Sequence, residues 1–181
     1  IAGTADVQNI VLSGAAGTGL VTVAGVETVN VVSASTGSTL AVAAGSATKL
    51  TVDADAATTV DASNAANASM ATVDMSASSG AVTLTAPAVA TLAVTGGSGA
   101  DSMTINNISA TTTVTGGDGA DKVTTSQTAL TQYDIANINA ETLAFSAAPT
   151  SLSLTGNTNI TTVDYTLGSG TSTLAGASDG M

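Results

Sequence analysis

Two glycine-rich segments that each end in an aspartate are the residues of this chain best suited to chemistry. Both fit the nonapeptide G-G-x-G-x-D-x-U-x, in which U is a large apolar residue. The glycines allow backbone carbonyls to converge on an ion, and the aspartate adds charged oxygens. Because Ca²⁺ takes about six to eight oxygen ligands, more than one loop supplies, we expect the ion to lie between two stacked loops. The candidate ligand residues are Gly96, Gly97, Gly99 and Asp101 in the first loop and Gly116, Gly117, Asp118, Gly119 and Asp121 in the second.

The two copies lie 20 residues apart, which predicts that they occupy successive turns of a repetitive fold. Such stacking would bring Asp101 and Asp121 into register on one edge, with Met103 and Val123 at the buried U positions. Asp118, at the variable position, either faces solvent or joins the ion shell. A single copy also suits a glycine-rich hairpin turn, but two near-identical copies favour metal binding. Nonapeptides at a nine-residue period are missing, so at most two turns of a calcium roll are expected.

Other acids allow two interpretations. Asp53, Asp55, Asp61 and Asp74 lie in and around Thr-Val-Asp triplets. They either cap strand ends on one edge of the stack, by accepting backbone N–H groups, or form a further Ca²⁺ site. Asp179 is the candidate ligand of a degenerate third loop. Glu27 and Glu141 hold equivalent places in a long-range repeat, where a structural role at a strand start is favoured over ligation.

The composition restricts the chemistry that the chain can support. Its 181 residues include 13 acids, two Lys or Arg, no His and no Cys, for a formal net charge of −11. A basic face for nucleic acid or for anionic membranes cannot be assembled, and soft ligands for Zn²⁺, Cu or Fe–S centres are absent. Without His, Cys or Arg, catalytic triads and arginine phosphate clamps are excluded, so no enzymatic activity is expected. No apolar run approaches the roughly 20 residues of a membrane span.

Short alternating stretches rich in Val and Thr, bounded by Gly, Ser, Asn or Asp, must position these residues. The pattern predicts an all-β chain, and 44% hydrophobic residues with only 2% aromatics suit a stack of small side chains. We expect a parallel β-helix or β-solenoid of roughly nine turns, with an antiparallel β-sandwich as the competing architecture. The Ala-rich stretch 61–70 could form one helical turn. Three segments are predicted: solenoid turns over 1–90, the calcium-binding turns over 91–125 and further β turns over 126–181.

The two nonapeptides, the Val26–Ser33 strand, the box at Thr59–Ser63 and the Cys-free, Thr- and Ala-rich composition together resemble RTX proteins. Within that group the chain is most similar to the calcium-dependent, Caulobacter-like surface-layer (S-layer) proteins of Gram-negative bacteria. The resemblance implies type I secretion, Ca²⁺-dependent folding outside the cell, and self-assembly of identical subunits into a cell-surface lattice anchored to lipopolysaccharide. We interpret the chain as a piece of a longer protein. Two other interpretations stay open: the repeat stalk of an RTX adhesin or surface filament, and the C-terminal RTX portion of a secreted enzyme.

Overall fold

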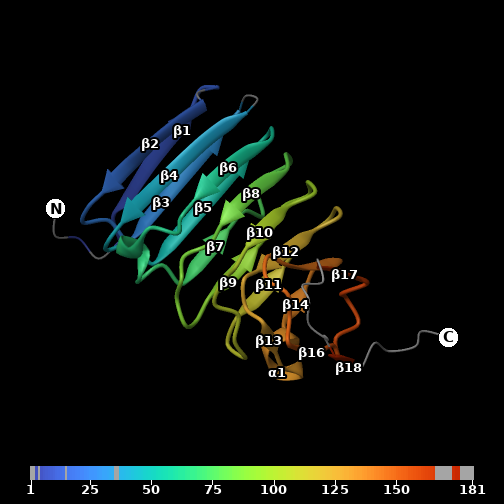
Figure 1. Cartoon of the computed structure of the whole chain (residues 1–181). Helices are drawn as coiled ribbons and strands as arrows, with labels where there is room; N and C mark the ends of the chain where they lie inside the picture. The colour runs from blue at the N-terminus through green and yellow to red at the C-terminus, as the bar shows by residue number, and fades with distance from the viewer. Residues whose placement is uncertain (1–2, 4, 15, 35–36, 166–172, 176–181) are drawn as a thin grey trace.

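Parallel β-strands account for almost all regular structure in the computed structural model, which describes residues 3, 5–14, 16–34, 37–165 and 173–175 (Figure 1). The chain alternates between two long sheets. The first sheet contains, in spatial order, β1 (Val7–Leu12), β3 (Thr28–Ser33), β5 (Lys49–Ala54), β7 (Thr72–Asp74), β9 (Ala93–Thr95), β11 (Thr113–Thr115) and β14 (Ile138–Asn139). The second contains β2 (Ala16–Val23), β4 (Ser38–Ala44), β6 (Thr58–Asp61), β8 (Val82–Thr85), β10 (Ser102–Thr104), β12 (Lys122–Thr125), β15 (Thr142–Phe145) and β17 (Thr162–Tyr165).

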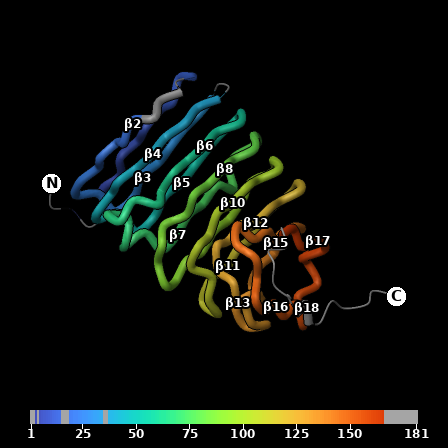
Figure 2. The backbone as a smooth tube through the Cα atoms, in the orientation of Figure 1, coloured from blue at the N-terminus to red at the C-terminus, as the bar shows by residue number. Residues whose placement is uncertain are grey.

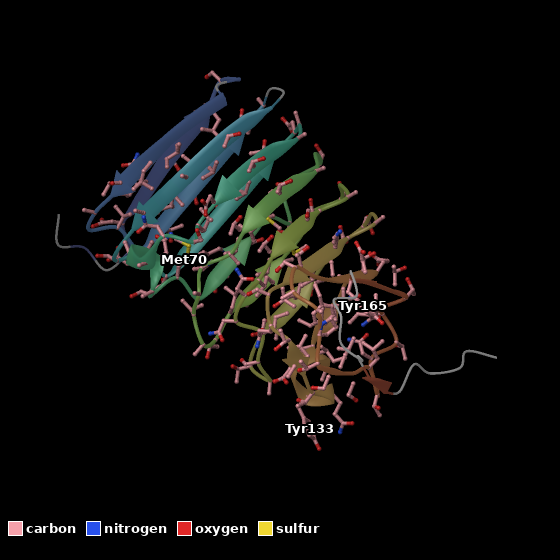
Figure 3. All side chains as sticks on the ribbon, viewed as in Figure 1. Met70, Tyr133 and Tyr165 are labelled. Atoms are coloured by element: carbon pink, nitrogen blue, oxygen red, sulfur yellow. The ribbon has the colours of Figure 1, made fainter. Side chains whose placement is uncertain are left out.

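The later turns add a third sheet and one short helix. The third sheet consists of β13 (Ala129–Leu130), β16 (Ser151–Ser153) and β18 (Thr173–Ala175). Helix α1 (Gln132–Ile135) follows β13 and is capped by Thr131, whose side chain accepts from the Asp134 N–H. Tyr133 on this helix points away from the body of the molecule (Figure 3) and is 67% exposed. The helical turn expected within 61–70 is present as a 3-10 helix, η1 (Ala65–Asn67), capped by Asn64.

The pairing of strands makes the molecule a β-solenoid of about seven turns. Each strand pairs in parallel with the strand one turn later, as in β10 with β12 and β9 with β11. The all-β class and the solenoid are therefore confirmed. The antiparallel sandwich is excluded, since every described strand pair is parallel. Turns are fewer than nine because several are longer than 20 residues: Val7 pairs with Thr28 and Thr58 pairs with Val82, which are turns of 21 and 24 residues.

The core consists of inward side chains stacked in rows along the solenoid axis. One row on the second sheet runs through Leu40, Val60, Leu84, Met103, Val123 and Leu143, each 2% exposed or less. The opposing row on the first sheet runs through Val29, Leu50, Val73, Val94, Val114 and Ile138. Met103 and Val123 therefore lie in the core, as the nonapeptide pattern predicts. Fully buried Met70 fills the space beside η1 (Figure 3).

Buried polar side chains satisfy backbone groups at the corners of the solenoid. Asn67, with no exposed surface, donates to the carbonyls of Val42 and Ala62 at 2.9 and 2.7 Å and accepts from the Ala44 N–H at 2.7 Å. Asn157 bridges Ile135 and Ile138 in the same manner. These bonds satisfy backbone groups that would be costly to bury without a partner.

Candidate functional site

The two glycine-rich loops form adjacent corners between the first and second sheets. The first, Gly96–Asp101, joins β9 to β10, and the second, Gly116–Asp121, joins β11 to β12. Figure 2 shows these corners following one another along one edge of the molecule. Because Ser102 pairs with Lys122, the preceding residues Asp101 and Asp121 occupy the same row. The expected register of the two aspartates is therefore found.

Glycine is needed in these loops because the backbones of successive turns touch. A Cβ on Gly96 would overlap the carbonyl oxygen of Gly116, and one on Gly117 would overlap that of Gly97. In the first loop, a Cβ on Gly99 would lie 2.6 Å from the backbone of the preceding corner. Gly117 has a φ of +103°, which side-chain-bearing residues rarely adopt. Close stacking thus accounts for most of the glycines in the motif.

The corner before the first loop takes part in the same stack, although the sequence pattern does not reveal it. Residues 75–81 join β7 to β8, and the Ser98 N–H donates to the Ser78 carbonyl at 2.9 Å. The second loop continues the stack, with the Asp118 N–H donating to the Gly97 carbonyl at 3.1 Å. Asp118 itself is exposed, as one of the two interpretations of its position predicts. The first loop is therefore enclosed on both sides by other corners.

Three acids on successive turns form a buried or half-buried row, the carboxylate column, made of Asp101, Asp121 and Glu141. The Asp101 N–H donates to Oδ1 of Asp121 at 2.8 Å, and the Asp121 N–H donates to Oε2 of Glu141 at 2.8 Å. Asp101 ends the column by accepting from the Val82 N–H through Oδ1 and from the Gly97 N–H through Oδ2, both at 2.8 Å. Each carboxylate thus reaches back one turn to a backbone donor.

Asp121 is the member of the column whose hydrogen bonding is incomplete. It is 1% exposed, and its Oδ2 has no hydrogen-bond partner, whereas Oδ2 of Asp101 accepts the Gly97 N–H. Burial raises the pKa of the Asp121 carboxyl above its ordinary value of 3.8, against the lowering effect of the bond from the Asp101 N–H. The negative charges of Asp101, Glu141 and Asp118 raise this pKa further. A buried acceptor of this kind is costly unless a proton or a cation satisfies it.

No side-chain cation balances the column. The chain has two Lys or Arg residues, and both are engaged elsewhere. Lys49 pairs with Asp74 and Lys122 with Asp164, each at 3.0 Å. At a turn spacing of about 4.8 Å and an effective dielectric near 20, each adjacent pair of charges repels by roughly 3 kcal/mol. The column therefore concentrates negative charge without a side-chain counter-charge when its carboxyls are ionised.

Glu141 and Glu27 both stand directly before a strand, as their structural interpretation predicts. Glu27 accepts the Asp6 N–H at 2.7 Å through Oε2, which repeats the contact between Glu141 and Asp121 one turn apart. Their equivalence in the long-range repeat is nevertheless incomplete, because Glu27 precedes β3 of the first sheet and Glu141 precedes β15 of the second. Only Glu141 therefore belongs to the corner that carries the glycine-rich loops.

The remaining acids behave mainly as turn acceptors. Asp61 accepts from the backbone and hydroxyl of Ser63 at 2.9 and 2.6 Å, and Asp74 accepts from those of Ser76 at 3.2 and 2.7 Å. The expectation of one shared edge is wrong for Asp61, which ends a strand of the second sheet, whereas Asp74 ends a strand of the first sheet, beside the strand that contains Asp53. Consecutive strands alternate between sheets, which separates neighbouring triplets.

Two further candidate residues are placed differently. Asp55 is exposed and accepts the Ser79 hydroxyl at 3.4 Å. Asp179, the proposed ligand of a third loop, lies outside the described residues.

A shallow groove of about 300 Å³ lies on the outer face of the first sheet, where Asp53 and Asp74 contribute to its lining. A ladder of polar side chains runs along it. Nδ2 of Asn30 donates to Oδ1 of Asn9 at 3.0 Å, and the Thr51 hydroxyl donates to Oδ1 of Asn30 at 2.5 Å. The ladder stabilises the sheet through cross-strand pairs. The ladder cannot be recognised from any single strand of the sequence, because it depends on the register between turns.

Among the described residues, no three acidic side chains converge as a ready-made metal centre. The carboxylates are instead spread one to a turn, so loop carbonyls would have to supply the other oxygens. Within the same ranges, no helix reaches the length and hydrophobicity of a membrane span. Comparison with protein-family models, curated proteins and solved structures finds no match to this chain.

Proposed function

We propose that this chain is a structural, Ca²⁺-stabilised β-solenoid segment of a secreted RTX-type surface-layer protein. The observation that carries the proposal is the carboxylate column at the corner of the two glycine-rich loops, which has no side-chain counter-charge. A divalent cation there would offset the repulsion and satisfy the open oxygen of Asp121. Because the column spans three turns, ion binding would hold those turns together.

Calcium fits this corner better than other common ions. The available donors are carboxylates and backbone carbonyls in an irregular arrangement, which suits the variable coordination of Ca²⁺. Mg²⁺ demands near-ideal octahedral geometry and gives up its water reluctantly. The absence of His and Cys from the chain leaves no soft ligands for transition metals. The cofactor of the proposed function is therefore Ca²⁺.

Assembly with identical subunits is the second part of the proposal. Outward-facing apolar side chains gather on the first turns: Val11 is 70% exposed and pairs with Val32, which is 38% exposed. Leu20, on the outer face of the second sheet, is 52% exposed. Exposed apolar patches of this kind support subunit contacts. Anchoring to lipopolysaccharide would involve other parts of the protein.

Thermal unfolding tests the metal role. Because a ligand at about 100 times its Kd stabilises by about 2.7 kcal/mol, saturating Ca²⁺ should raise the melting temperature by roughly 5–10 °C over chelator. Mg²⁺ at equal ionic strength serves as the control and should produce a much smaller rise. Equal melting temperatures in Ca²⁺ and in chelator would remove the metal from the proposed function.

Electron microscopy tests the assembly role. Purified protein with added Ca²⁺, and the native cell surface, should show two-dimensional sheets that disperse in chelator. Single fibres would instead indicate a filament. Monodisperse particles in both conditions would contradict self-assembly and favour an adhesin stalk or the C-terminal portion of a secreted enzyme.

A further inference from the structure

We infer that the cation binds on the C-terminal side of the second loop, between Asp121 and Glu141, and not between the two glycine-rich loops. Glu141 then becomes a ligand that lies outside both nonapeptides. This inference rests on the proposed Ca²⁺ role, and it assigns that role to one loop and to the turn that follows.

The space between the two loops is closed by backbone. Gly96 packs against the carbonyl of Gly116 and Gly117 against that of Gly97, each so tightly that a Cβ would overlap. The Asp118 N–H donates to the Gly97 carbonyl at 3.1 Å, so this oxygen already has a donor. An ion between the loops would have to separate these contacts.

Each carboxylate oxygen of the first loop already has a backbone donor. Both oxygens of Asp101 accept backbone N–H groups at 2.8 Å, one from Val82 and one from Gly97. The bond from Val82 joins the first loop to β8, and the bond from Gly97 lies within the loop. Asp101 therefore acts as a structural acceptor in the arrangement described.

The far side of the second loop is open, because the next corner is much shorter. Thr115 pairs with Asn139, and Lys122 pairs with Thr142, so six residues of the second loop face only Ala140 and Glu141. Residues 117–120 are accordingly exposed, whereas Gly97 of the first loop is buried. Gly119 has a φ of +123°, which is one of the differences between the second loop and the first.

The second loop contains a buried oxygen without a partner. Oδ2 of Asp121 lies inside the second loop against Gly116, where a Cβ would overlap it. The described hydrogen bonds of Glu141 occupy its Oε2 with the Asp121 N–H and leave Oε1 for another contact. One oxygen from each of two successive turns, with carbonyls of the second loop, provides a hard-ligand set suited to Ca²⁺.

Carboxylate-detected NMR of the intact chain provides the first test. On titration with CaCl₂, we expect the side-chain carboxylate carbons of Asp121 and Glu141 to shift together, with the smallest change at Asp101. Shifts at Asp101 and Asp121 without one at Glu141 would place the ion between the loops and overturn the inference. If no carboxylate shifts, the proposed Ca²⁺ role fails with it.

Matched variants provide the second test, with Ca²⁺ affinity measured by calorimetry. Glu141→Gln keeps an oxygen for the Asp121 N–H but removes the charge, and it should weaken Ca²⁺ binding by about tenfold or more. Glu27→Gln makes the same change at an acid with the same backbone contact on the other sheet, and it should leave the Kd unchanged. Wild-type affinity in Glu141→Gln, with the parent chain binding Ca²⁺, would overturn the inference alone.

Discussion

At the scale of single residues, the site depends on how two chemically identical aspartates are hydrogen-bonded. Asp101 has a backbone donor for each oxygen, whereas Asp121 has one for Oδ1 only. The nonapeptide motif is the same in both loops and cannot reveal this difference. The bond to Oδ2 of Asp101 comes from its own loop, at Gly97, and the second loop has a different backbone conformation, with positive φ at Gly117 and Gly119.

Removing the charge of Asp121 should affect the metal-free and metal-bound forms in opposite directions. Asp121→Asn retains an oxygen for the Asp101 N–H and removes repulsion from the column. Because a stability gain of 1 kcal/mol raises the melting temperature by about 2–4 °C, we expect a rise of a few degrees in chelator. In Ca²⁺ the variant should gain no further stability. Asp53→Asn, an exposed change of equal charge, is the control. A variant that melts below the parent in chelator would contradict this account.

The pH dependence of the metal-free protein follows from the same carboxyl. Because the pKa of Asp121 is raised on folding, its stabilising contribution is complete below the ordinary value of 3.8 and is lost as pH rises through the folded pKa. In chelator, stability attributable to Asp121 should therefore increase on acidification from pH 7. The difference in melting temperature between parent and Asp121→Asn, measured from pH 4 to pH 7, should shrink toward low pH.

Asp74 should show the opposite behaviour. Its pKa is lowered by the hydrogen bond from Ser76 and by Lys49. The stability it contributes is therefore present above the ordinary value of 3.8 and lost as pH falls through the lower folded pKa. The pair is partly exposed, so the effect should stay within about 1 kcal/mol. Melting temperatures of the parent and of Lys49→Met, measured in a pH series below pH 4, test this effect. If both proteins lose stability equally on acidification, Lys49 does not lower the pKa of Asp74 as described.

At the scale of elements, close packing of loops determines where glycine is required. Gly96→Ala forces a Cβ into the carbonyl of Gly116, so we expect it to destabilise the protein by about 1–3 kcal/mol, as other overpacked sites do. Gly19→Ala is a matched control in β2, because its Cβ would meet nothing within 4 Å and it should be neutral or slightly stabilising. Urea unfolding of both variants measures the difference. Equal stabilities would show that the loops do not stack as described.

Sequence patterns predicted the elements of this solenoid better than the contacts between turns. Alternating Val and Thr identified the strands, and the 20-residue spacing placed Asp101 beside Asp121. Glu141 also lies 20 residues after Asp121, so the same spacing could have placed it in the row, but it stands outside the glycine-rich motif that identified the two aspartates. The polar ladder at Asn9 and Asn30 was also missed, because it joins residues 21 apart that belong to different strands and share no local motif. Register between turns depends on packing, which local periodicity does not encode.

At the scale of the whole molecule, each turn of the solenoid contacts mainly its neighbours (Figure 1). Stability in such a stack is approximately the sum of the individual turns and their interfaces. A cation bound at one corner should therefore stabilise the turns that it joins, β12 and β15, and the adjacent turn at β10 more than the distant strands β3 and β5. A globular protein with one shared core would distribute the effect more evenly.

Hydrogen exchange with and without Ca²⁺ tests the central claim most directly, because it reports local opening along the chain. We predict that chelation accelerates amide exchange over 96–125 and 142–145, while exchange in β3 and β5 changes little. Asp121→Asn should abolish the difference between the two conditions. Identical exchange over 96–125 in Ca²⁺ and in chelator would contradict the claim that a cation at the carboxylate column holds these turns together.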